Sequence, residues 1–150
     1  MEAAATTARA LAERRPSGLL HVGIAGARGI DAPELVIGSE AVYEDAAGGA
    51  LVPGRVQADR DFLAAARRAL PDALVLPIGT SARVGGASGC TVEAMEGFAV
   101  LRAAELAGVP AVEVRAVSNE IDEPDRSRWR FDDALAALDR ALPLLLAELR

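Results

Sequence analysis

The amino-acid sequence predicts an α/β fold, in which helices cover a central β-sheet. Segments with apolar residues at helical spacing alternate along the chain with short runs rich in Val, Ile and Leu, which are typical of buried strands. Glycine and proline residues separate most of these segments, as expected at the ends of helices and strands. With 150 residues the chain has the size of one domain, so we expect residues 1–150 to form a single unit.

The first predicted elements are a helix and a strand. Residues 2–15 are strong helix formers, and the sequence Pro-Ser-Gly that follows them ends the helix. Residues 19–25 have the pattern of a short buried strand and lead into a glycine loop at residues 26–29, where backbone N–H groups would lie near a ligand. A glycine loop is also typical of a tight turn with positive φ. We interpret His21, inside the strand, as a core or hydrogen-bonded residue without a catalytic role.

The middle of the chain contains two more predicted strands. The first of them carries Gly38 near its centre, which indicates a bulge or bend. A loop rich in glycine and hydroxyl residues follows the second, and such a loop either carries a function or connects elements at the surface. In order, we predict a strand over residues 35–43, a loop over 46–55, a helix over 59–70, a strand over 74–78 and a loop over 79–90.

The sequence of the last third of the chain predicts a helix, a strand and a second helix. Residues 93–107 are apolar on more than one face, which is typical of a buried helix. Gly108 suits a left-handed conformation at the end of that helix. A strand over residues 112–119 and a charged loop over 120–129 follow. The final helix begins near Asp132, where the macrodipole favours acids, and we expect it to pack through its leucines without taking part in chemistry.

Four polar side chains are expected to meet at the carboxyl end of the last predicted strand, which is where ligands bind in open α/β sheets. They are Glu96, Arg115, Ser118 and Asn119. Glu96 is the most notable, because a carboxylate that faces a core must be paired or hydrogen-bonded. Three of them have a plainer interpretation. Glu96 could simply favour a helix N-terminus, Arg115 could form an exposed ion pair with Glu113, and Asn119 could belong to an ordinary turn.

The spacing of these residues resembles that of a known family. The sequence Glu-x-Met-Glu-Gly at residues 93–97, the sequence Arg-x-x-Ser-Asn at 115–119 and the Gly-x-Ala-Gly strand end at 23–26 resemble the purine nucleoside phosphorylase/nucleosidase superfamily. The Ser-Asn pair and the segment 125–129 are most similar to the futalosine hydrolase branch. The resemblance implies a mixed central sheet flanked by helices, and it implies that family strands that precede the first helix are absent from this chain.

The resemblance also implies a role for each site residue. Glu96 matches the family carboxylate that holds the ribose 2′- and 3′-hydroxyls, and Met95 matches the residue beneath the sugar. Arg115 matches the arginine that positions the attacking water. Ala25 and Gly26 would lie beside the ribose, and Ser118 would steady Asn119. Residues 79–90 would contact the base.

The base end of the site distinguishes between substrates. A 6-oxopurine presents an acceptor at C6 and needs a donor there, whereas a 6-aminopurine needs an acceptor, and an asparagine amide can donate. Asn119 therefore predicts a hypoxanthine-type base, as in futalosine or inosine. Hydrolysis of the N-glycosidic bond of futalosine is the expected reaction. A methylthioadenosine/S-adenosylhomocysteine nucleosidase, a purine nucleoside phosphorylase, or a catalytically incomplete nucleoside-binding domain are the alternatives. One departure bears on the substrate, because Asp122-Glu123-Pro124 stand where the futalosine hydrolase branch has an arginine.

Composition excludes several other classes. The net charge of −6, with no basic cluster, argues against a nucleic-acid partner. Cys90 is the only cysteine, so an intramolecular disulfide and a cysteine metal cage are excluded. The longest apolar run near the end is too short to span a bilayer. We expect a cytoplasmic enzyme that uses water and neither a metal nor a cofactor, and the resemblance implies a homodimer or higher homo-oligomer.

Overall fold

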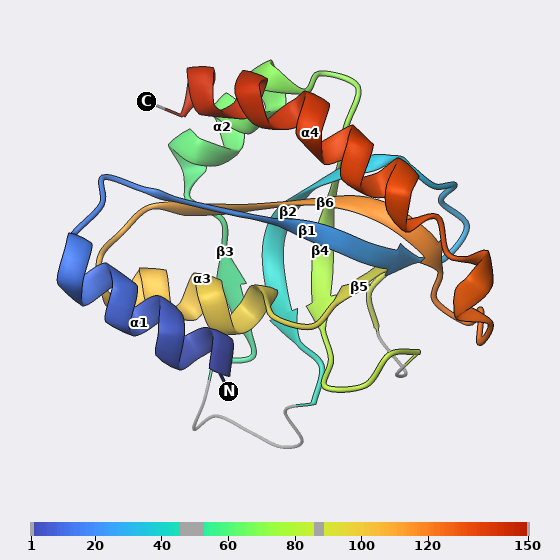
Figure 1. The fold of residues 1–150 in the computed structure, drawn as a ribbon. Coiled ribbons are helices and arrows are strands. Elements are labelled where there is room, and N and C mark those ends of the chain that lie inside the picture. Colours follow the sequence, from blue (N-terminus) through green and yellow to red (C-terminus); the bar gives the residue numbers. More distant parts are fainter. Residues whose placement is uncertain (1, 46–52, 86–88, 150) are drawn as a thin grey trace.

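A computed structural model describes residues 2–45, 53–85 and 89–149. A β-sheet forms the middle layer and helices cover both of its faces (Figure 1). On one face lie α1 (Glu2–Arg14) and α3 (Gly97–Leu106), and on the other lie α2 (Arg60–Ala69) and α4 (Phe131–Glu148). This arrangement confirms the predicted α/β class.

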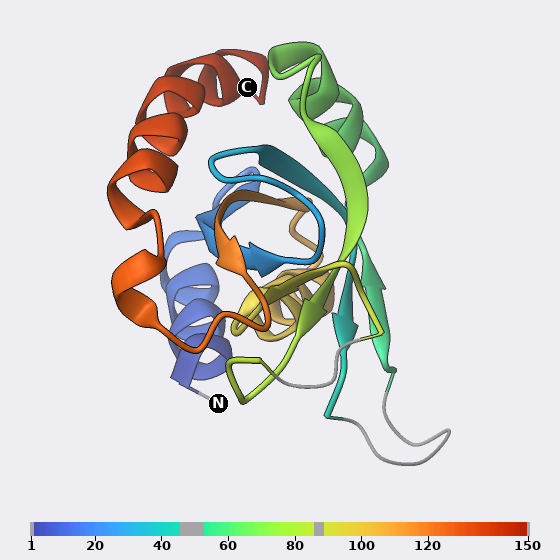
Figure 2. The same ribbon diagram turned by 90° about the vertical axis from the view of Figure 1, so that its right-hand side faces the viewer.

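The sheet is mixed and six-stranded, with strand order β3-β2-β4-β5-β1-β6. It curls until β2 also pairs with β6, which closes the strands around a common interior (Figure 2). The pairs β1–β6, β2–β4 and β4–β5 are parallel, and the other pairs are antiparallel. The strands are β1 (Leu19–Ala27), β2 (Leu35–Tyr43), β3 (Arg55–Gln57), β4 (Leu74–Thr80), β5 (Val92–Ala94) and β6 (Ala111–Glu120).

Strand β6 carries a polar face and an apolar face. Val112 and Val114 pack with residues of α2 and α4 in one hydrophobic cluster. Because side chains alternate along a strand, Glu113 and Arg115 point to the opposite face. The parallel register with β1 places Gly23 beside Arg115 and Gly26 beside Asn119. The carboxyl ends of β1 and β6 therefore present their polar side chains on the same side of the sheet.

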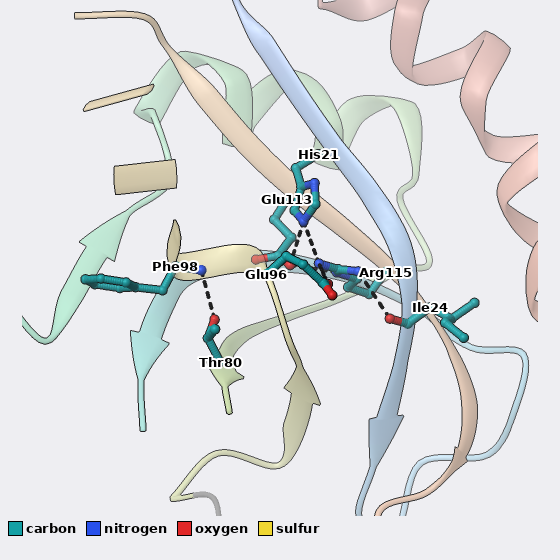
Figure 3. Close-up of polar contacts among 7 residues, drawn as sticks. All are labelled: His21, Ile24, Thr80, Glu96, Phe98, Glu113 and Arg115. Carbon is teal, nitrogen blue, oxygen red and sulfur yellow. Dashed lines mark hydrogen bonds and ion pairs between the residues drawn. The ribbon is translucent and has the colours of Figure 1, made fainter. Parts of the chain in front are cut away.

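The helix predicted over residues 93–107 begins later than predicted. Residues 92–94 form β5, which pairs with both β1 and β4, and α3 begins only at Gly97. The apolar pattern hid this boundary, because a buried strand and a buried helix have the same composition over three or four residues. The hydroxyl of Thr80 accepts a hydrogen bond from the Phe98 N–H at 2.8 Å and so caps the first turn of α3 (Figure 3).

Several other boundaries agree with prediction and some do not. Strand β2 spans the predicted residues, its pairing with β4 shifts register after Gly38, and Gly108 has a φ of +68° at the end of α3. The predicted glycine loop at 26–29 starts late, because β1 continues to Ala27 through its pairs with β5 and β6. Strand β3 occupies the end of the predicted loop 46–55, and β4 extends into the predicted loop 79–90. Residues 46–52 and 86–88, which belong to these two predicted loops, lie outside the described residues.

Within the described ranges no helix is long and apolar enough to cross a bilayer.

Candidate active site

A cavity of about 250 Å³ opens at the carboxyl ends of β1 and β6. Every residue that was given an individual role from the sequence lines it, in agreement with the expectation that these side chains meet at this edge, whereas only Val84 and Gly85 do so among the described residues of the loop predicted to contact the base. The predicted lining residues are Ala25, Gly26, Met95, Glu96, Arg115, Ser118 and Asn119. The residues without a predicted individual role are Ile24, Val84, Gly85, Glu93, Ala94, Ile121 and Trp129.

Arg115 lies at the inner wall of the cavity, with only 4% of its side chain exposed. Its Nε donates to Glu113 Oε1 at 2.6 Å, and its Nη1 donates to the Ile24 carbonyl at 3.3 Å. Its Nη2 lies 2.6 Å from His21 Nε2 and 3.6 Å from Glu96 Oε2 (Figure 3). The guanidinium is thus held by three acceptors, two of which, Glu113 Oε1 and His21 Nε2, lie 3.9 Å apart, and its charge faces Glu96 across the cavity wall.

Glu113 makes the pair with Arg115 a buried one, whereas the sequence suggested that such a pair would be exposed. The Glu113 side chain is fully buried, and it lies under the first residue of α3. Burial raises the pKa of Glu113, and the Arg115 charge and hydrogen bond oppose that rise. A buried carboxylate is costly unless it is paired, so Glu113 and Arg115 depend on each other energetically. Sequence reasoning missed Glu113 as a site residue, although its place two residues before Arg115 on a buried strand was a usable signal.

His21 is hydrogen-bonded within the core, in agreement with the interpretation from the sequence. Burial, and to a lesser extent the Arg115 charge, lower its pKa from 6.5 to about 3. The geometry gives the same answer, because Nε2 receives an arginine N–H at 2.6 Å and must carry a lone pair rather than a proton. The imidazole is therefore neutral at neutral pH, with its proton on Nδ1.

The sequence suggested that Glu96 lies inside a buried helix, and this prediction is wrong. It is the residue immediately before α3, and 47% of its side chain is exposed where it lines the cavity. Its main stabilising contact in the described structure is the Arg115 guanidinium. The reason for the difference is the strand β5, which turns residues 95–96 into a connection at the cavity rim. The carboxylate is therefore accessible to a ligand in the cavity.

Asn119 presents an amide whose orientation is fixed by its neighbours. Its Oδ1 accepts from the Ser118 hydroxyl at 2.8 Å, and its Nδ2 donates to the Glu120 carbonyl at 2.9 Å. The opposite orientation would bring two oxygens together at the Glu120 carbonyl, so the amide nitrogen is assigned to that side. Because an amide nitrogen carries two hydrogens, one N–H of Asn119 stays available to a ligand after this bond is made.

Trp129 is a lining residue for which sequence reasoning gave no role. Its Nε1 donates to the Glu123 carbonyl at 3.1 Å, and its ring lies against Arg126 and Phe131. It separates the main cavity from a second one of about 350 Å³, which Val84, Gly85 and Ile121 also line. The sequence marked Trp129 only as part of the segment 125–129 that carries the resemblance, because the charged loop over 120–129 reaches the cavity only through the tertiary fold.

Metal-ligating side chains do not gather in this region. Among the described residues, no group of three or more His, Cys, Asp or Glu side chains lies close enough together to hold a metal ion. The polar groups of the cavity are instead suited to hydrogen bonding: two carboxylates, a guanidinium, a hydroxyl and an amide, from Glu93, Glu96, Arg115, Ser118 and Asn119.

Comparison with known proteins places the chain in a family. A family model described as the phosphorylase superfamily matches residues 1–149. The chain belongs to this superfamily. The superfamily assignment and the architecture of the chain both agree with the resemblance found in the sequence. Solved structures support the same fold, with TM-scores of 0.87 for a methylthioadenosine/S-adenosylhomocysteine nucleosidase from Colwellia psychrerythraea at 18% identity, and 0.85 for futalosine hydrolase from Helicobacter pylori at 15% identity.

Curated relatives of this phosphorylase superfamily member match over shorter stretches. Futalosine hydrolase from Streptomyces coelicolor is 54% identical over 54 residues, which is 36% of this chain and 23% of that protein. Futalosine hydrolase from Thermus thermophilus is 47% identical over 60 residues, which is 40% of this chain and 27% of that protein. The matched region thus spans about a quarter of these relatives. The structural matches cover more, 97–98% of this chain and 73–74% of the two solved proteins.

Proposed function

We propose that this site hydrolyses the N-glycosidic bond of a purine nucleoside, and that futalosine is its substrate. The observation that carries the proposal is that an acid, a guanidinium and an amide line one cavity at the carboxyl edge of the sheet. The stretches of 47–54% identity to two futalosine hydrolases support the choice of substrate.

The sugar end of the reaction requires stabilisation of positive charge. Cleavage of the bond to the base builds an oxocarbenium-like sugar, and groups that bind this state more strongly than the substrate accelerate the step. The accessible carboxylate of Glu96 would accept hydrogen bonds from the ribose 2′- and 3′-hydroxyls and face the developing charge. Arg115, 3.6 Å from Glu96, would hold that carboxylate in place and orient the attacking water. Met95, half-exposed in the cavity, would pack beneath the sugar.

The base end of the reaction requires a hydrogen-bond donor for a 6-oxopurine. The available N–H of Asn119 would donate to O6 or N7 of hypoxanthine as negative charge builds on the departing base. A site that donates at this place rejects a base that presents a second donor, because buried polar groups are then left unpaired. Ser118 fixes the amide through its hydroxyl, so the donor is already oriented when the substrate binds.

Two adjoining cavities would give room for a substrate larger than a simple nucleoside. The main cavity of about 250 Å³ lies below the roughly 300–1,000 Å³ of typical small-molecule sites. It adjoins the second cavity of about 350 Å³ across Trp129. Together they would hold a base, a sugar and a substituent attached to the sugar, so their combined volume is compatible with futalosine.

The test is product analysis with a set of substrates. We expect release of hypoxanthine from futalosine without phosphate, and at least tenfold lower kcat/KM for methylthioadenosine and inosine. Adenine release from methylthioadenosine at the higher rate would contradict the choice of base. Strict dependence on phosphate would contradict hydrolysis. A single structural unit, a homodimer and a cytoplasmic location also stay predictions, and light scattering after size-exclusion chromatography would test the dimer.

A further inference from the structure

A polar cluster, made of His21, Arg115 and Glu113, lies directly behind the cavity. The imidazole and the carboxylate contact neighbouring nitrogens of the guanidinium, Nη2 and Nε, at 2.6 Å each, and their own contacting atoms are 3.9 Å apart. The side chains of Glu113 and Arg115 are almost completely buried and that of His21 is 18% exposed. Polar groups at this depth are costly to desolvate unless every one finds a partner. The desolvation of this cluster costs free energy, and the cluster contacts the proposed site. These two observations indicate that it has a functional role.

The backbone around the cluster leaves room for it. A Cβ at Gly23 of β1 would lie 2.2 Å from Arg115 Nη1, and a Cβ at Gly97 of α3 would lie 2.3 Å from Glu113 Oε2. Both positions therefore need glycine while the pair occupies its present place. Gly97 is the glycine of the Met-Glu-Gly sequence, so the residue next to Glu96 is fixed by the packing of the Arg115–Glu113 pair.

The contacts determine which part of Arg115 is available to the cavity. Glu113 takes the Nε–H, the Ile24 carbonyl takes one Nη1 hydrogen, and His21 takes one Nη2 hydrogen. The other Nη2 hydrogen is on the side of Glu96, whose Oε2 lies 3.6 Å away. Removal of the imidazole would leave Nη2 without this acceptor. The guanidinium could then turn about its remaining hydrogen bond to Glu113 and move away from Glu96.

We propose that His21 is a positioning residue for the reaction: its neutral imidazole accepts from Arg115 Nη2 and, beside Glu113, orients the guanidinium towards Glu96 (Figure 3). This inference rests on the proposed function, because Glu96 and Arg115 are its catalytic groups. His21 itself lines no part of the cavity described above. It acts through Arg115 and not on the substrate.

The expected effect is on turnover more than on binding. Small displacements of an orienting group can cost up to about a hundredfold in rate. We expect His21→Leu, which has no acceptor, to lower kcat for futalosine by about tenfold to a hundredfold while KM changes by less than about threefold. His21→Gln, whose side-chain oxygen can reach the same Nη2, should recover kcat to within about threefold of the wild type.

A control on the same strand separates positioning from stability. Val22 neighbours His21 in β1 and packs into the cluster on the opposite face of the sheet. Val22→Ala should lower the unfolding midpoint while kcat stays at the wild-type value. Wild-type kcat in folded His21→Leu would overturn the proposal. An equal loss of kcat in His21→Leu and His21→Gln would also overturn it, because the acceptor would then not matter.

A measurement without turnover keeps the test independent of the proposed function. The Arg115 Nη2 hydrogens, identified by their loss in Arg115→Lys, should exchange with water at least tenfold faster in His21→Leu than in the wild type or His21→Gln, as seen by ¹⁵N NMR. Unchanged exchange in His21→Leu would refute the positioning role even if the enzyme is active. If the wild-type protein cleaves no nucleoside, the proposed function fails, and the exchange rates still decide whether His21 holds Arg115.

Discussion

The neutral state of His21 predicts a specific pH dependence of stability. The substitution His21→Gln keeps a hydrogen-bond acceptor near Arg115 but removes the titrating group. The pKa of His21 is about 3 in the folded protein and 6.5 in the absence of the fold. Between these values the unfolded chain binds one more proton than the folded protein. The free energy of unfolding therefore falls as the pH falls through this window.

The size of the effect follows from the shift. Each pH unit within the window changes the free energy of unfolding by about 1.4 kcal/mol, so His21 costs the wild-type protein about 2 kcal/mol between pH 7 and pH 5. Burial and the Arg115 charge keep this cost in place, because both disfavour the protonated imidazole and so lower the pKa of His21. The His21→Gln variant lacks this contribution. The acidic side chains titrate in both the wild-type protein and the variant, so they do not account for the difference.

The assay is urea unfolding of both proteins at pH 7 and pH 5, with the free energy extrapolated to zero denaturant. We expect the wild-type protein to lose about 2 kcal/mol more than His21→Gln over this interval. Parallel losses in the two proteins would show that His21 titrates normally in the fold. That result would refute both the buried environment of the imidazole and its role as an acceptor for Arg115.

Three further substitutions test other parts of the account. Gly97→Ala should lower the free energy of unfolding by about 1–3 kcal/mol, because the new Cβ would meet Glu113 Oε2 at 2.3 Å, and urea titration measures it. Arg115→Met should cost about 3–5 kcal/mol at pH 7, since it leaves a carboxylate buried and unpaired. That loss should shrink as the pH falls towards 4.5, because burial raises the Glu113 pKa and protonation then removes the charge; a loss that grows on acidification would contradict this. Asn119→Asp should shift kcat/KM at least tenfold towards 6-aminopurine nucleosides, and an unchanged ratio would contradict the assignment of Asn119 to the base.

Much of the fold was predictable because the sequence marks it locally. Gly38 marks a register shift, Gly108 ends a helix with a positive φ, and the strand over residues 35–43 stands between clear boundaries. The start of α3 was not predictable in the same way. Val92, Glu93 and Ala94 are compatible with either state, and only the pairing with β1 and β4 decides that they form a strand.

The site was predictable where residues are close in sequence and less so where the fold assembles them. Ser118 and Asn119 follow Arg115 on one strand, so their proximity was expected. The contact between His21 and Arg115 joins residues 94 positions apart, and it depends on the parallel register of β1 and β6. The exposure of Glu96 likewise depends on where α3 begins. Trp129 enters the cavity through the tertiary path of a loop, which no local pattern encodes.

The most direct test of the proposed chemistry is the turnover of futalosine by Glu96→Gln. The amide is nearly isosteric but lacks the charge that would stabilise the sugar, so we expect kcat to fall by at least about a hundredfold with little change in the unfolding midpoint. Glu105→Gln, an exposed acid near the other end of α3, is the matched control and should keep wild-type activity. Futalosine cleavage by Glu96→Gln at the wild-type rate would contradict the central claim that this cavity is where the glycosidic bond is broken.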